Sequence, residues 1–124
     1  MGRGITPQKK EYTAKEMEVH ARYQKALDEF LSRALEGYRE RIERIILFGS
    51  VARGEAREES DIDLLIVTKA EDFQLRRVLI GLAFDILLET GEDISVKALS
   101  KADFERMKNY SFLQHVLSEG VQVA

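Results

Sequence analysis

Two aspartates separated by one isoleucine, Asp61 and Asp63, open the apolar stretch DIDLLIVT. Side chains at positions i and i+2 of a β-strand lie on the same face, so both carboxylates should project together, about 6–7 Å apart along the chain. Ile62 should point the other way, into the core. Two carboxylates this close repel each other unless a cation lies between them, and hard oxygen ligands suit Mg²⁺. The pair therefore predicts a divalent-metal site.

A Gly-Ser pair, Gly49 and Ser50, closes the preceding apolar run IERIILFGS. Glycine after a strand permits a sharp turn and a close approach of the backbone to a ligand. If a short helix begins at Ser50 or the next residue, its free N–H groups favour an anion, and the Ser50 hydroxyl adds a donor. Arg53 and Arg57 bring positive charge nearby, although Arg57 is better explained as a surface arginine paired with a neighbouring glutamate. These residues predict a phosphate-binding turn.

The helices that would support these groups follow from the hydrophobic pattern. Two long segments carry apolar residues at spacings of three and four, the period of an amphipathic helix. Ser100 with Asp103 is a capping-box signature for a third helix, and Ser111 is expected to cap a fourth. The expected ranges are about 13–38, 73–87, 101–107 and 111–120.

Three strands are expected between these helices, over about 42–50, 61–68 and, more weakly, 93–99. The ten residues between the first two strands are fewer than the dozen or more usual for a parallel crossover, so we expect antiparallel pairing. Antiparallel pairing places Ser50 and Asp61 at the same end of the sheet, whereas parallel pairing would separate them by about 20 Å. The order of elements indicates an α/β fold with a small sheet flanked by helices.

Length and composition narrow the class of protein. With 124 residues the chain is expected to form a single domain, 1–124, with residues 1–11 as a loose tail. The absence of cysteine excludes disulfides and cysteine-based metal sites. No apolar run approaches the roughly 20 residues that span a bilayer, and the N-terminus lacks the apolar core of a secretory signal, so we expect a cytoplasmic protein with no membrane partner. The net charge is −3 and no basic stripe is interleaved with aromatics, so nothing signals nucleic-acid binding.

The segment GSVARGEAREESDID resembles the signature of the nucleotidyltransferase superfamily, which is Gly-Ser, a spacer of about ten residues, and Asp-x-Asp. The form GSxARG…SDIDLL resembles the minimal nucleotidyltransferases, small MNT-type domains often paired with a HEPN-domain partner in toxin–antitoxin modules. The resemblance covers nearly the whole chain, including the final EGVQV. It implies a polymerase-β-like palm with a mixed sheet, and Mg²⁺-dependent transfer of AMP from ATP to an acceptor hydroxyl.

The resemblance also implies a role for each motif residue. Gly49 and Ser50 would grip the triphosphate, and Arg53 would steady phosphate charge. Asp61 and Asp63 would hold two Mg²⁺ ions, which in such enzymes stabilise the attacking and leaving oxygens of an in-line displacement.

The superfamily uses a third acid on its third strand, either as a metal ligand or as the base for the acceptor's proton. Asp93, in GEDISVKAL, is the candidate for both roles. Glu92 is a less suitable candidate, and a further alternative is that the chain has no third acid. Without one, nucleotide binding could survive while turnover falls steeply.

Three functions are consistent with these residues. The first is an enzyme that adenylylates a hydroxyl of a partner protein, most naturally a tyrosine of a HEPN-type toxin, since the chain is too small to build an acceptor pocket alone. The second is an antitoxin that binds nucleotide with weak or no turnover and neutralises its partner by covering it. The third is transfer to a small molecule or an RNA end, which would require a homo-oligomer to create the acceptor site.

Overall fold

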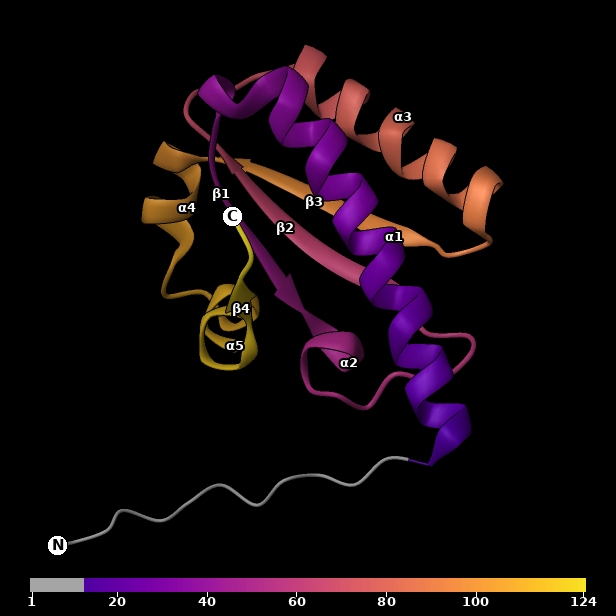
Figure 1. The fold of residues 1–124 in the computed structure, drawn as a ribbon. Coiled ribbons are helices and arrows are strands. Elements are labelled where there is room, and N and C mark those ends of the chain that lie inside the picture. Colours follow the sequence, from indigo (N-terminus) through magenta and orange to yellow (C-terminus); the bar gives the residue numbers. More distant parts are fainter. Residues whose placement is uncertain (1–12) are drawn as a thin grey trace, which may run out of the picture.

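Four strands form one sheet in the order β3-β2-β1-β4. The structure is a computed structural model that describes residues 13–124 (Figure 1). β1 (Ile42–Phe48) pairs antiparallel with β2 (Ile62–Thr68) and with the short β4 (Val121–Gln122). β2 pairs parallel with β3 (Ile94–Ser100). The sheet is therefore mixed, which confirms the predicted fold class and the antiparallel pairing of the two motif strands.

Two long helices, α1 (Ala14–Tyr38) and α3 (Phe73–Thr90), pack on one face of the sheet. α1 begins with a capping box, in which the Thr13 hydroxyl accepts from the Glu16 N–H at 3.1 Å and the Glu16 carboxylate accepts from the Thr13 N–H at 2.9 Å. These caps satisfy donors that the first turn leaves without a partner inside the helix. The core between these helices and the sheet has as its largest fully buried side chains Tyr23, Phe30, Ile45, Ile62, Leu64, Ile66, Leu75, Leu79 and Ile86.

Two short helices, α4 (Lys101–Met107) and α5 (Ser111–Glu119), cover part of the opposite face. The Ser100 hydroxyl caps α4 by accepting from the Asp103 N–H at 3.1 Å, as expected. The expectation for Ser111 was wrong by one residue, because α5 has Tyr110 at its cap position and no side-chain cap. Both faces of β2 are thus covered, which explains its unbroken apolar sequence. The buried residues of this second cluster are Ile46, Phe48, Leu65, Val67, Phe104, Leu113 and Val116.

The strand ends at the motif differ slightly from those expected. β1 stops at Phe48, because Gly49 has a φ of +79° and starts the one-turn helix α2 (Gly49–Ala52). β2 and β3 each begin one residue later than expected, at Ile62 and Ile94. A short 3₁₀ helix, η1 (Arg39–Arg41), and β4 were not expected, since segments of two or three residues carry no recognisable period. The expected tail 1–11 lies outside the described residues.

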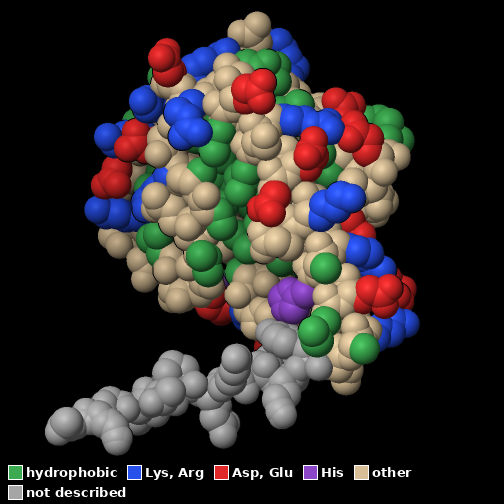
Figure 2. Space-filling view, viewed as in Figure 1, with side chains coloured by type: hydrophobic (Ala, Val, Ile, Leu, Met, Phe, Trp, Pro, Cys, Tyr) green, Lys and Arg blue, Asp and Glu red, His purple; other side chains and the backbone are tan. Residues whose placement is uncertain are grey.

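The surface carries both signs of charge. On the face shown in Figure 2, Lys and Arg side chains alternate with Asp and Glu, and hydrophobic side chains gather in a band across the middle. This face therefore lacks the one-sign patch that nucleic-acid binding usually needs. From residue 13 onward, none of the helices combines the length and the apolar character required to cross a bilayer.

Candidate active site

The two motifs meet at one end of the sheet. Phe48, the last residue of β1, is the antiparallel partner of Asp63 on β2, so Gly49 comes directly after the residue opposite Asp63. The contact is tight, since a Cβ added to Gly49 would lie 2.3 Å from Oδ2 of Asp63. The φ of +79° at Gly49 is also one that side chains rarely permit. Only glycine fits here, and it brings the turn after β1 against the Asp63 carboxylate.

α2 places Ser50 in the same turn. The Arg53 N–H donates to the Gly49 carbonyl at 3.1 Å, and the Glu55 N–H donates to the Ser50 carbonyl at 2.9 Å, which closes the turn on itself. The first N–H groups of a helix have no acceptor within it and favour an anion. The structure therefore brings Gly49, Ser50 and Asp63 together, in an arrangement suited to a phosphate group beside a carboxylate.

The two aspartates influence each other. Asp61 is exposed just before β2, and Asp63 is half-buried within it. Burial raises the pKa of Asp63, and the negative charge of Asp61 raises it further, while Lys97 and Arg53 lower it. A bound cation would offset both the cost of burying the charged Asp63 carboxylate and its repulsion from Asp61. Two neighbouring carboxylates are hard oxygen ligands, so this donor set fits a divalent ion such as Mg²⁺.

Arg53 lies beside this site but is held by two carboxylates. Its guanidinium contacts Glu55 at 2.8 Å and Glu119 of α5 at 3.2 Å, and these hydrogen bonds raise the pKa of Arg53. The ion pairs join α2 to the end of α5. The Arg53 charge still reaches Asp63, whose pKa it lowers. The structure thus places the predicted phosphate-binding arginine near the site, with its donors shared among protein groups.

The structure does not gather Asp93 into one cluster with Asp61 and Asp63. Asp93 is exposed just before β3, and its backbone carbonyl accepts from the Ile62 N–H at 2.9 Å. Within residues 13–124, no group of three histidine, cysteine or acidic residues lies close enough to share a metal ion. Glu92, the second candidate, is buried and pairs with Arg22 of α1 at 3.3 Å. The role of Asp93 as a third acid therefore stays a prediction, and in residues 13–124 neither it nor Glu92 forms a three-acid cluster with the aspartate pair.

β3 instead presents Ser95 and Lys97 to the site. Ser95 is the parallel partner of Asp63, and Lys97 follows two residues later on the same face. The Lys97 Nζ lies 3.5 Å from the Ser95 Oγ. A cation therefore stands beside Asp63 on the β3 side. Its place could be known only from the register of two strands about thirty residues apart in sequence.

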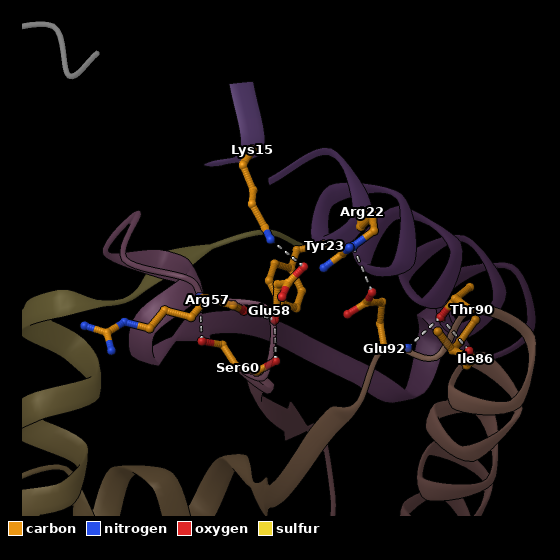
Figure 3. A network of polar contacts seen from close by, with 9 residues as sticks. All are labelled: Lys15, Arg22, Tyr23, Arg57, Glu58, Ser60, Ile86, Thr90 and Glu92. Carbon is orange, nitrogen blue, oxygen red and sulfur yellow. Dashed lines mark hydrogen bonds and ion pairs between the residues drawn. The ribbon is translucent and has the colours of Figure 1, made fainter. Parts of the chain in front are cut away.

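A buried tyrosine on α1 fixes the loop between the motifs (Figure 3). The Tyr23 hydroxyl is part of a side chain only 1% exposed, and it donates to the backbone carbonyls of Arg57 and of Ser60, the latter at 2.8 Å. The Ser60 hydroxyl in turn accepts from the Arg57 N–H at 2.8 Å. These contacts hold the backbone that leads into Asp61. Tyr23 was not expected from the sequence, and its one signal is its position four residues before Leu27 on the apolar stripe of α1.

α1 also forms ion pairs with both loops at this end of the sheet, the one before β2 and the one before β3. Figure 3 shows Lys15 near Glu58 in the motif loop and Arg22 near Glu92 in the turn before β3, with separations of 3.5 and 3.3 Å. Burial raises the pKa of Tyr23, and the negative charge of Glu92 adds to the effect, so the phenol stays a neutral donor. The helix therefore ties together the two loops that carry the candidate acids.

Comparisons with known proteins agree on the class of domain. Residues 29–124 match the family described as "Polymerase beta, Nucleotidyltransferase". A Methanocaldococcus jannaschii protein named "putative protein adenylyltransferase" is 44% identical over 97 residues, which are 78% of this chain and 93% of that protein.

Solved structures resemble the fold. The crystal structure of a "putative nucleotidyltransferase" from Sulfolobus solfataricus has a TM-score of 0.54 at 20% identity, over 90% of this chain and 87% of that one. A toxin–antitoxin structure with AMP-PNP has a TM-score of 0.50 at 22% identity, over 77% of this chain and 70% of that one. At these identities the structural likeness concerns the fold alone.

Proposed function

The chain belongs to the polymerase β nucleotidyltransferase family, and from this premise we propose that it transfers AMP from ATP to a hydroxyl group of a partner protein. One observation carries the proposal, the contact between the Gly49 turn and the Asp63 carboxylate. It joins a phosphate-binding backbone to a metal-binding acid, which is the equipment that a nucleoside triphosphate requires. We take residues 1–124 as a single nucleotidyltransferase domain.

The triphosphate is proposed to lie against the turn formed by Gly49 and Ser50. The absence of a side chain at Gly49 lets phosphate oxygens approach the backbone, and the Ser50 hydroxyl donates a further hydrogen bond. Arg53 would release a carboxylate partner to reach a phosphate. Asp61 and Asp63 would hold Mg²⁺, which supplies charge neutralisation to the phosphates and an electrophilic α-phosphorus.

The reaction is a single displacement at the α-phosphorus. The acceptor oxygen forms a bond to phosphorus, the bond to the bridging oxygen of pyrophosphate breaks, and pyrophosphate leaves with that electron pair. The hydroxyl proton passes to water or to Asp93, which is exposed at the same rim. Holding the reacting atoms in line is the main task of such a site.

The acceptor is proposed to be a tyrosine on a HEPN-type partner. The 44% identical relative is named as a protein adenylyltransferase, which supports a protein acceptor. The toxin–antitoxin structure of similar fold contains AMP-PNP, which supports both an ATP-like substrate and a toxin as the partner.

A second function has its own support. No third carboxylate in residues 13–124 joins Asp61 and Asp63, so an antitoxin that binds nucleotide with little turnover is the alternative. Such a protein would neutralise its partner by binding alone.

Incubation with ATP labelled at the α-phosphate, Mg²⁺ and the partner protein separates the two. The wild-type chain and Asp85→Ala, which removes an exposed acid of α3, should label the partner, while Asp61→Ala should not. No transfer by wild type, together with neutralisation by the double variant Asp61→Ala, Asp63→Ala, would leave the binding function alone.

A further inference from the structure

The acceptor side of the site follows from strand order. In an in-line displacement the attacking oxygen lies opposite the leaving oxygen. The leaving pyrophosphate is proposed to lie over the Gly49–Ser50 turn, which follows β1. β1 and β3 flank β2 on opposite sides, and Asp63 belongs to β2 (Figure 1). The acceptor oxygen must therefore approach Asp63 from the β3 side, a step that rests on the proposed function.

On that side the chain presents a cation. Ser95 is the β3 residue paired with Asp63, and the Lys97 Nζ reaches back to 3.5 Å from the Ser95 hydroxyl. Asp63, Ser95 and Lys97 lie on the same face of the paired strands β2 and β3. The ammonium group therefore lies on the same side of the sheet as the Asp63 carboxylate, next to the residue paired with it.

The carboxylates at the site suit one divalent ion. Mg²⁺ is usually held by one or two carboxylates and completes its shell with waters and substrate phosphates, so Asp61 and Asp63 supply the protein ligands of a single ion. In enzymes with two metals, the second ion stabilises the attacking oxygen. Here that ion would lie beside the Lys97 ammonium, and in the described part of the chain no third acid clusters with the pair to offset the repulsion.

We propose that this site binds one divalent cation per nucleotide, and that the Lys97 ammonium occupies the acceptor side where two-metal enzymes hold a second ion. The lysine would then supply the positive charge that the attacking oxygen meets. An aspartate at position 97 should restore a carboxylate on that side and with it a second ion.

Manganese counting tests this without any turnover. Free Mn²⁺ is measured by electron paramagnetic resonance during a titration in the presence of saturating AMP-CPP. The link between the α- and β-phosphates of this analogue cannot be cleaved, so no AMP is transferred. Bound Mn²⁺ is then counted per bound nucleotide. Wild type should bind one Mn²⁺, and Lys97→Asp should bind two. Lys69→Asp makes the same change of charge just beyond the other end of β2 and should still bind one.

Each other result is decisive. Two Mn²⁺ ions in wild type, or one in Lys97→Asp, would overturn the role of Lys97 while leaving nucleotide transfer intact. Absence of AMP-CPP binding to wild type would overturn the proposed function as well. Because Lys97 is exposed, its substitution should leave the urea unfolding midpoint close to that of Lys69→Asp, which checks that the variant is folded.

Discussion

Replacing Gly49 by alanine would disturb the contact that joins the two motifs. The new methyl carbon would lie 2.3 Å from the Asp63 Oδ2, whereas ordinary van der Waals contact begins at 3.4 Å, so the carboxylate must move by about 1 Å. Alanine would also have to adopt the φ of +79°. The substitution therefore combines displacement of the Asp63 carboxylate, the proposed metal ligand, with backbone strain.

The strain can be separated from the displacement by a matched variant. Gly91, at the end of α3, has a φ of +80°, and nothing lies within 4 Å of a Cβ added there. Left-handed backbone costs a non-glycine residue about 1–2 kcal/mol, so Gly91→Ala should lose about that much free energy of unfolding. Gly49→Ala should lose at least as much.

The displacement should appear in function. A misplacement of about 1 Å can cost roughly 100-fold in rate, or about 2.7 kcal/mol of transition-state stabilisation. We expect Gly49→Ala to transfer AMP about 100-fold more slowly than Gly91→Ala and to bind Mg²⁺ with AMP-CPP more weakly by calorimetry. Equal affinity and equal transfer in the two variants would show that the Gly49–Asp63 contact plays no part in the reaction.

Two further predictions concern the support and the charge of the site. Tyr23→Phe removes the donor to the carbonyls of Arg57 and Ser60, so the free energy of unfolding should fall by about 1–3 kcal/mol in urea titrations, while Tyr38→Phe on the same helix should change it little. Burial raises the pKa of Asp63 in the folded state, so the folded chain holds its proton to a higher pH than the unfolded chain does. Stability due to this group therefore falls as pH rises from about 4 through the folded pKa, and Asp63→Asn should be more stable than wild type at pH 7 but not at pH 3.

Contrary outcomes are as clear. An equal loss of unfolding free energy in Tyr23→Phe and Tyr38→Phe would show that the hydrogen bonds from Tyr23 do not stabilise the loop before Asp61. If urea unfolding in the absence of metal instead finds Asp63→Asn less stable than wild type at pH 7, that result would show that the folded structure does not disfavour the charged Asp63 carboxylate.

The sequence was sufficient for the fold and for the meeting of the motifs because both depend on local signals. Apolar periods located the helices and strands, and a ten-residue spacer favoured antiparallel pairing. A glycine suits a phosphate-binding turn and an aspartate suits a metal site, so the sequence predicted that Gly49 and Asp63 would lie at the same end of the sheet. Strand ends shifted by one or two residues, because the turn at Gly49 and not the apolar pattern decides where β1 stops.

The rest depends on contacts between distant segments. Tyr23 meets a backbone 34 and 37 residues away, and nothing in the local pattern distinguishes it from other residues on the stripe of α1. Lys97 lies on the same face as Asp63, two residues beyond its partner Ser95, only because β2 and β3 pair in one particular register. Arg53 was expected to meet phosphate, yet its nearest partners are Glu55 and a glutamate of α5, since the position of α5 is a property of the whole fold.

Crystals grown with Mn²⁺ and AMP-CPP test most directly whether this rim of the sheet is a nucleotidyl-transfer site. An anomalous difference map should show manganese between the carboxylates of Asp61 and Asp63, with the triphosphate lying against Gly49 and Ser50. A triphosphate bound on another surface, or manganese without either aspartate as a ligand, would contradict the assignment of the site.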